Sequence, residues 1–75
     1  MSLKLTINGV GREIEALESP ATLAAVVEAL TLKSDRIAVE LNGEIARRDS
    51  WSAAEVRSGD RLEVVHFVGG GCLQA

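Results

Sequence analysis

Only one segment of this 75-residue chain has the periodicity of an α-helix, and segments with the periodicity of β-strands lie on both sides of it. Four apolar residues in this segment recur at i, i+3, i+4 and i+7, namely Leu23, Val26, Val27 and Leu30. They share one helical face. Thr22 is a suitable N-cap. We therefore expect one main helix, over residues 23–30, that lies across a sheet.

Apolar and polar residues alternate on both sides of this helix, which predicts strands with one buried face. The alternation runs through residues 3–7, 12–16, 37–41, 44–46 and 61–68. Residues 8–11 form the first predicted turn, because Asn8 and Gly9 tolerate positive φ, and Asn42-Gly43 is the strongest short-range signal for a two-residue hairpin. Residues 51–56 contain few strand formers, so we expect a turn or short helix there.

Two hairpins that flank one helix, followed by a long apolar strand, indicate an α+β fold. We expect a roll in which a mixed sheet of four to five strands packs on the helix. Residues 1–68 would form this domain. Residues 69–75 would form a flexible tail, because three consecutive glycines lose much backbone entropy on ordering and have no side chains to pack.

Length and composition exclude several classes of function. A domain of this size buries only about 60% of the surface of its unfolded chain, which disfavours a deep enclosed active site. The net charge of −3 is spread along the chain, and there are only two aromatic residues, so we expect no binding to nucleic acid. No apolar stretch approaches the length of a membrane span and no signal peptide is evident, so we expect a soluble, cytoplasmic protein.

The chain also lacks the patterns of cofactor, metal and catalytic sites. A single cysteine forms no internal disulfide, and no cluster of residues has the spacing of metal ligands. His66 has no nucleophile or carboxylate motif beside it, and Arg47-Arg48-Asp49 is typical of a solvated turn. Trp51 is expected to be a core or edge anchor. We therefore expect a chain that is not an enzyme and binds no cofactor itself.

The most distinctive local feature is Gly69-Gly70-Gly71, near the end of the sequence. A run without side chains is narrow enough to thread a channel that any Cβ would block. Cys72-Leu73-Gln74-Ala75 follow, and they keep the carbonyl of Gly71 in an amide.

The last predicted strand contains a second candidate functional site, in addition to the glycine run. Leu62 and Val64 are natural core positions, which places Val65 and Phe67 on the opposite face of the sheet. Either a bulge or a loop covers these two side chains, or they form a patch for docking a partner, since contiguous exposed apolar area usually marks interaction. The sequence leaves both interpretations open.

Residues 3–71 resemble the sulfur carrier proteins of thiamine biosynthesis, small β-grasp proteins with the ubiquitin-like fold. The resemblance is carried by the order and spacing of several pieces. These are the opening strand with Asn8-Gly9, the run from Ala38 to Trp51, the run from Ser58 to Val65, and the terminal Gly-Gly. Each piece is common, but the combination is typical of this family.

The resemblance implies that the chain is a substrate of other enzymes. In the family, a ubiquitin-activating-type adenylyltransferase uses ATP and magnesium to adenylate the C-terminal glycine, here Gly71. The product is converted to a thiocarboxylate, which donates sulfur to a thiazole synthase. Gly70 and Gly71 would be the functional residues and Gly69 a spacer. The partners would dock on the tail and the adjoining sheet, which includes Val65 and Phe67.

The chain departs from the family pattern after Gly71, because typical carriers end at Gly-Gly. Our first hypothesis is that a metal-dependent peptidase removes residues 72–75, as happens in related carriers that supply sulfur to cysteine or to secondary metabolites. A second is an N-to-S acyl shift at Gly71-Cys72. Other functions remain open: a carrier for another sulfur pathway, a modifier joined to lysines of target proteins, or a binding module without acyl chemistry.

Overall fold

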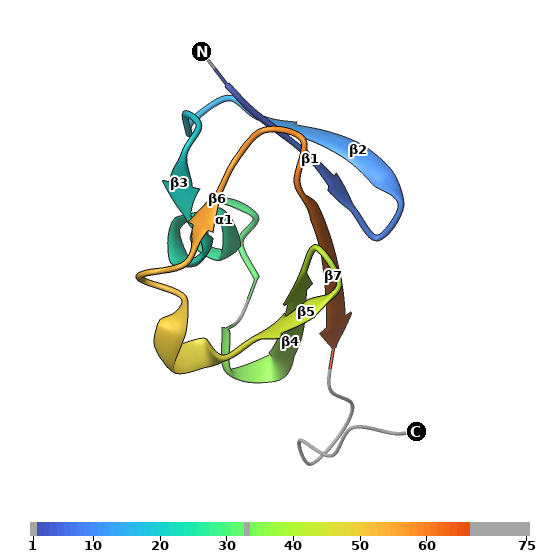
Figure 1. Cartoon of the computed structure of the whole chain (residues 1–75), viewed down its shortest axis with the longest axis vertical. Coiled ribbons are helices and arrows are strands. Elements are labelled where there is room, and N and C mark those ends of the chain that lie inside the picture. The colour runs from blue at the N-terminus through green and yellow to red at the C-terminus, as the bar shows by residue number, and fades with distance from the viewer. Residues whose placement is uncertain (1, 33, 67–75) are drawn as a thin grey trace.

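The structure is a computed structural model that describes residues 2–32 and 34–66 (Figure 1). Its elements, in chain order, are β1 (Leu3–Ile7), β2 (Val10–Ile14), β3 (Ala21–Thr22), α1 (Leu23–Ala29), the 3-10 helix η1 (Ser34–Arg36), β4 (Ile37–Leu41), β5 (Glu44–Ala46), the 3-10 helix η2 (Arg48–Ser50), β6 (Glu55–Val56) and β7 (Arg61–His66).

The main sheet has five strands in the order β2-β1-β7-β4-β5. The central strand β7 is parallel to its neighbour β1, and every other pair in this sheet is antiparallel. Helix α1 lies on one side of this sheet (Figure 1). The predicted mixed sheet and α+β class are therefore confirmed.

One hydrophobic cluster joins the helix to the sheet. Its members are Leu3, Leu5, Ile7, Ile14, Leu23, Val26, Val27, Ile37, Val39, Trp51, Val56, Leu62 and Val64. Three of the four apolar helix positions identified by their spacing are in this cluster. The alternating strand residues supply most of the rest, so the inner face of the sheet is the face toward α1. We call the opposite face the outer face.

The predicted helix start is confirmed, because the Thr22 hydroxyl accepts a hydrogen bond from the main-chain N–H of Ala25 at 3.1 Å. The helix ends at Ala29, one residue earlier than predicted. Thr31 has a φ of 57°, and its N–H donates to the carbonyl of Glu28 at 3.0 Å. This left-handed residue redirects the chain and ends the helix.

The second strand begins at Val10 rather than residue 12 and ends at Ile14 rather than residue 16. Asn8 and Gly9, with φ of 52° and 81°, form a two-residue turn, and Ile7 pairs directly with Val10. The sequence prediction was wrong because it assigned four residues to this turn. Asn42 and Gly43, with φ of 53° and 88°, close the predicted second hairpin in the same way.

A second sheet, of two short strands, was not predicted. β3 pairs with β6 through Ala21↔Val56 and Thr22↔Glu55. Sequence analysis predicted no strand at residues 21–22 and a turn or short helix over residues 51–56, whereas the 3-10 helix lies at residues 48–50. Two-residue strands have no detectable alternation, and the pairing here depends on tertiary structure, because Val56 is fully buried in the core.

Candidate functional site

Strand β7 is the element that leads toward the glycine tail, and its side chains alternate between the two faces of the sheet. Leu62 and Val64 are buried against α1, as predicted, whereas Val65 is 46% exposed. Residues 62–66 of β7 pair with β4 in continuous register, from Leu41↔Leu62 to Ile37↔His66, so no bulge interrupts the strand. Val65 therefore lies on the outer face.

Two further apolar residues share this face. Ala38 is directly opposite Val65 on β4, and Ile45 on β5 is 76% exposed. Ile45 pairs with Glu40, which stands two residues after Ala38 on the same face of β4. We call Ala38, Ile45 and Val65 the outer patch. Sequence analysis found only Val65, because the neighbours of a strand residue depend on a cross-strand register that local periodicity does not give.

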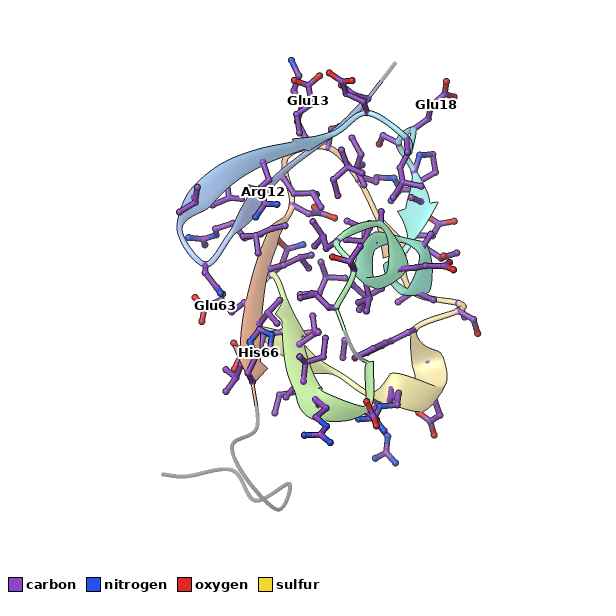
Figure 2. The ribbon with its side chains drawn as sticks, turned by 180° about the vertical axis from the view of Figure 1, so that it is seen from behind. Arg12, Glu13, Glu18, Glu63 and His66 are labelled. Carbon is purple, nitrogen blue, oxygen red and sulfur yellow. The ribbon has the colours of Figure 1, made fainter. Side chains whose placement is uncertain are left out.

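Two carboxylates lie beside the outer patch. Glu40 and Glu63 are directly opposite each other on β4 and β7. Neither makes a hydrogen bond or ion pair with any other residue that the structure describes. Glu63 points away from the helix side of the molecule (Figure 2). Like charges directly opposite on a sheet destabilise it, so this pair raises the free energy of the isolated chain.

The other candidates from the sequence form no catalytic arrangement. His66 is exposed at the end of β7 (Figure 2), and no side chain in the described ranges forms a hydrogen bond or ion pair with it. Arg47 and Asp49 form an ion pair at 3.7 Å with both side chains largely exposed, consistent with a solvated turn. Trp51 is confirmed as a core anchor, because it is 4% exposed and its Nε1 donates to the carbonyl of Ala46 at 2.8 Å.

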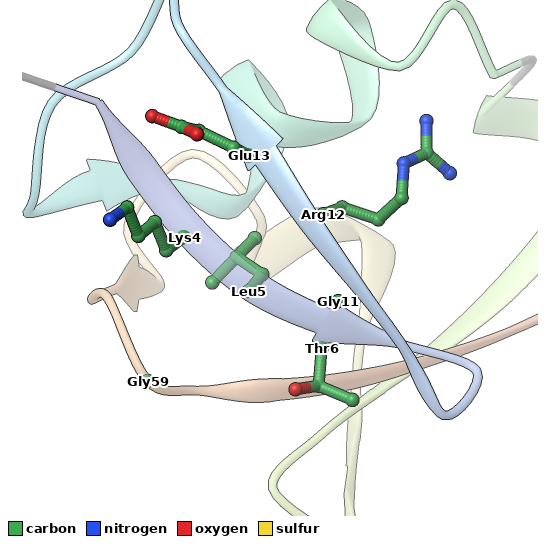
Figure 3. Close-up of a pocket in the computed structure, with 7 residues that line it drawn as sticks. All are labelled: Lys4, Leu5, Thr6, Gly11, Arg12, Glu13 and Gly59. Carbon is green, nitrogen blue, oxygen red and sulfur yellow. The ribbon is translucent and has the colours of Figure 1, made fainter.

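An open hollow of about 420 Å³ lies over β1, β2 and the turn before β7 (Figure 3). Its lining includes Lys4, Thr6, Gly11, Glu13 and Gly59. Lys4 and Glu13 pair across the two strands and have opposite charges. The lining contains no histidine, cysteine or aspartate, and residues 2–32 and 34–66 hold no group of three or more side chains suited to a metal ion.

Several predicted site residues lie outside the described ranges. These are Phe67, Gly69, Gly70, Gly71 and Cys72, so their roles stay predictions, as does the division of the chain at residues 68 and 69. Within the part of the chain that the structure describes, no helix has the length and apolar character needed to cross a membrane.

Comparisons of the sequence and of the structure with known proteins point to the same family. The model of the ThiS family matches residues 5–71. The sulfur carrier protein ThiS of Bacillus subtilis is 30% identical over 61 residues, which cover 81% of this chain and 92% of that protein.

Two proteins named thiazole synthase also match. The one from Paramagnetospirillum magneticum is 41% identical over 97% of this chain, and the one from Magnetococcus marinus is 33% identical over 92%. The chain spans only 22% and 20% of the lengths of these two relatives.

A solved structure has the same fold. The crystal structure of the thiamine biosynthesis protein ThiS from Geobacter metallireducens superimposes with a TM-score of 0.78 at 33% identity. The match covers 92% of this chain and all of that one. The resemblance noted in the sequence is thus confirmed: the chain belongs to the ThiS family and has its ubiquitin-like β-grasp fold.

Proposed function

We propose that this chain is a sulfur carrier for the synthesis of the thiamine thiazole, and that it is a substrate of its partner enzymes rather than an enzyme itself. The observation that carries the proposal is the family match, which extends through Gly70 to Gly71. The similarity to a Bacillus subtilis protein named as a sulfur carrier supports it. The two related thiazole synthases support a thiazole synthase as the sulfur acceptor.

The proposed chemistry takes place at the carboxylate of Gly71. A free carboxylate is a poor acyl electrophile because its leaving group would be oxide. Attack of the carboxylate on the α-phosphorus of ATP, in the magnesium-dependent site of an adenylyltransferase, releases pyrophosphate and gives an acyl-adenylate. Hydrosulfide then attacks the acyl carbon and forms a C–S bond as the C–O bond to AMP breaks, and AMP leaves with the bonding electron pair. The resulting thiocarboxylate is the form that donates sulfur.

This route requires a free carboxylate at Gly71, and in the present sequence Cys72 follows it. The proposal therefore includes cleavage after Gly71 by a metal-dependent peptidase. The alternative, an acyl shift to the thiol of Cys72, needs no cleavage. The substitution Cys72→Ala separates the two routes, because it leaves peptidase cleavage possible and abolishes the shift.

Mass spectrometry of the protein from cells that are making thiamine tests the proposal. We expect a species that ends at Gly71, part of which has the mass change of one oxygen replaced by sulfur. The same species should form with Cys72→Ala. Finding only chains uncleaved at Gly71 during active sulfur transfer would contradict the cleavage step.

We propose the outer patch, together with Phe67, which follows Val65 by two positions in the sequence, as the docking surface for the partner enzymes. Ile45 and Val65 are exposed apolar side chains on the outer face of the sheet. Val65 belongs to β7, the strand that precedes the tail in the sequence. A partner surface with apolar groups and an arginine or lysine would cover the patch and also neutralise Glu40 and Glu63. Among the residues that the structure describes, the like-charge pair has no such partner, so the complex would supply one.

Alanine substitution in the outer patch tests this docking surface. We expect Ile45→Ala and Val65→Ala each to raise the KM for the adenylyltransferase roughly tenfold, since truncating an apolar anchor typically costs about 1–2 kcal/mol of binding. Urea unfolding should show little loss of stability. Val10→Ala is the matched control, because Val10 is 59% exposed but lies on edge strand β2 at the other end of the sheet. Reduced stability with an unchanged KM would instead assign the patch a structural role.

A further inference from the structure

Strand β7 is paired on both edges where it begins, but on only one edge where it ends. β4 accompanies it as far as His66. On the other edge β1 pairs only through Thr6↔Arg61 and Ile7↔Leu62, because the chain then turns at Asn8 and Gly9. The end of β7, which leads toward Gly71, therefore lacks a main-chain partner on the β1 side.

The side chain of Asn8 supplies the missing partner. Main-chain bonds run from the N–H of Thr6 to the carbonyl of Asp60 at 3.1 Å and from the N–H of Asn8 to the carbonyl of Leu62 at 2.9 Å. In a regular parallel ladder the N–H of Val64 would next donate to the main-chain carbonyl of Asn8. Instead it donates to Asn8 Oδ1 at 2.8 Å, and Asn8 Nδ2 donates to the carbonyl of Val64 at 3.2 Å. The carboxamide thus takes the place of a peptide group.

The turn itself does not require these contacts. Its left-handed φ of 52° at residue 8 is accessible to glycine at least as easily as to asparagine. The second hairpin gives a comparison within the same molecule, because Asn42 has a φ of 53° and its Oδ1 accepts from the N–H of Arg61 at 2.9 Å. The two asparagines therefore bond the same strand, Asn42 at its first residue and Asn8 near its end.

We propose that Asn8 is a positioning residue for acyl transfer, a role that rests on the proposed sulfur-carrier function. By fixing Val64 it orders the end of β7, including Val65 of the outer patch, before a partner docks. The described chain then ends, at His66, in a defined position. Without the carboxamide, the end of β7 must be ordered during docking, and the free-energy cost of this ordering weakens binding.

The substitution Asn8→Gly tests this role, because glycine keeps the left-handed turn and removes the carboxamide. In the full chain we expect the amide of Val64 to exchange its hydrogen about tenfold faster. With the adenylyltransferase and a chain that ends at Gly71, we expect KM to rise about five- to tenfold while kcat is unchanged, since the reacting atoms are the same once the tail is bound. The shortened chain contains both Asn8 and Val64, and none of the removed residues 72–75 takes part in the contacts between them.

Two further variants complete the test. Asn42→Gly is the matched control: it removes the same side chain from the same kind of turn and also removes a hydrogen bond to β7, and its KM should stay within about twofold of the unsubstituted chain. Asn8→Asp should have an intermediate effect, because a carboxylate still accepts from the N–H of Val64 but no longer donates to its carbonyl.

Equal KM values for Asn8→Gly and the unsubstituted chain, or an equal rise in Asn42→Gly, would overturn the positioning role and leave the sulfur-carrier proposal intact. A fall in kcat at constant KM would overturn it as well. Failure of the unsubstituted chain that ends at Gly71 to form an adenylate would reject the carrier function, and the positioning role with it.

Discussion

A chain that ends at Gly71 is expected to form an acyl-adenylate with its adenylyltransferase, whereas a chain that continues through Ala75 is expected to form none. The difference follows from the group at the reacting carbon. In the shorter chain the carbonyl of Gly71 belongs to a carboxylate, whose oxygen attacks the α-phosphorus of ATP. In the longer chain it belongs to the amide with Cys72, which has no anionic oxygen.

Exchange of labelled pyrophosphate into ATP measures this step directly. The chain that ends at Gly71 should support exchange, and the 75-residue chain should give only the background of the enzyme alone. Adding the peptidase to the longer chain should restore exchange. Equal exchange by both chains, without cleavage, would contradict the requirement for a free carboxylate.

A chain that ends at Gly70 is the control for the position of the carboxylate. It has the same terminal chemistry, but its reacting carbon stands one residue, at most about 3.5 Å, closer to the sheet. Misplacement of a reacting group by about 1 Å can already cost about 100-fold in rate, so we expect at least this loss in kcat/KM. Full activity of this shorter chain would show that the tail length is not matched to the partner site.

Much of the fold could be predicted because its signals are local. The i, i+3, i+4, i+7 spacing located α1, period-two alternation located β1, β4 and β7, and the two Asn-Gly pairs marked the hairpins. β3 and β6 were missed because each has two residues, and their pairing joins positions 21 and 56. The first residue of β2 was misplaced because a four-residue turn and a two-residue turn fit the same sequence.

In the candidate site, too, the features with local signals could be predicted and those that depend on distant pairings could not. Alternation within β7 was enough to place Val65 on the outer face, but Ile45 joins it only through pairing of β7 with β4 and of β4 with β5. The contact of Asn8 with Val64 spans 56 positions in the sequence. Sequence analysis could identify Asn8 as a turn residue, but not as the residue that completes β7.

Trp51→Ala should destabilise the domain more than any of the substitutions in the outer patch or in the two Asn-Gly turns. Trp51 is 4% exposed, its Nε1 bonds the carbonyl of Ala46, and its own carbonyl accepts from the N–H of Ala24 at 3.1 Å. It therefore connects the end of β5 to the start of α1. Removing a buried tryptophan side chain costs about 3–5 kcal/mol. A domain of this length has a total stability of roughly 4–11 kcal/mol, so a large share of it would be lost.

Trp51→Phe separates the two contributions of this side chain. It keeps an aromatic ring in the core and removes the hydrogen bond to Ala46, for an expected loss of about 1–2 kcal/mol. Since Trp51 is the only tryptophan, unfolding in urea should be followed by circular dichroism rather than by tryptophan fluorescence. Because Trp51 packs in the core and the outer patch is on the other face, Trp51→Phe should leave the KM for the adenylyltransferase unchanged. A loss as large as that of Trp51→Ala would assign most of the stabilisation to the hydrogen bond, and a raised KM would connect the core to docking.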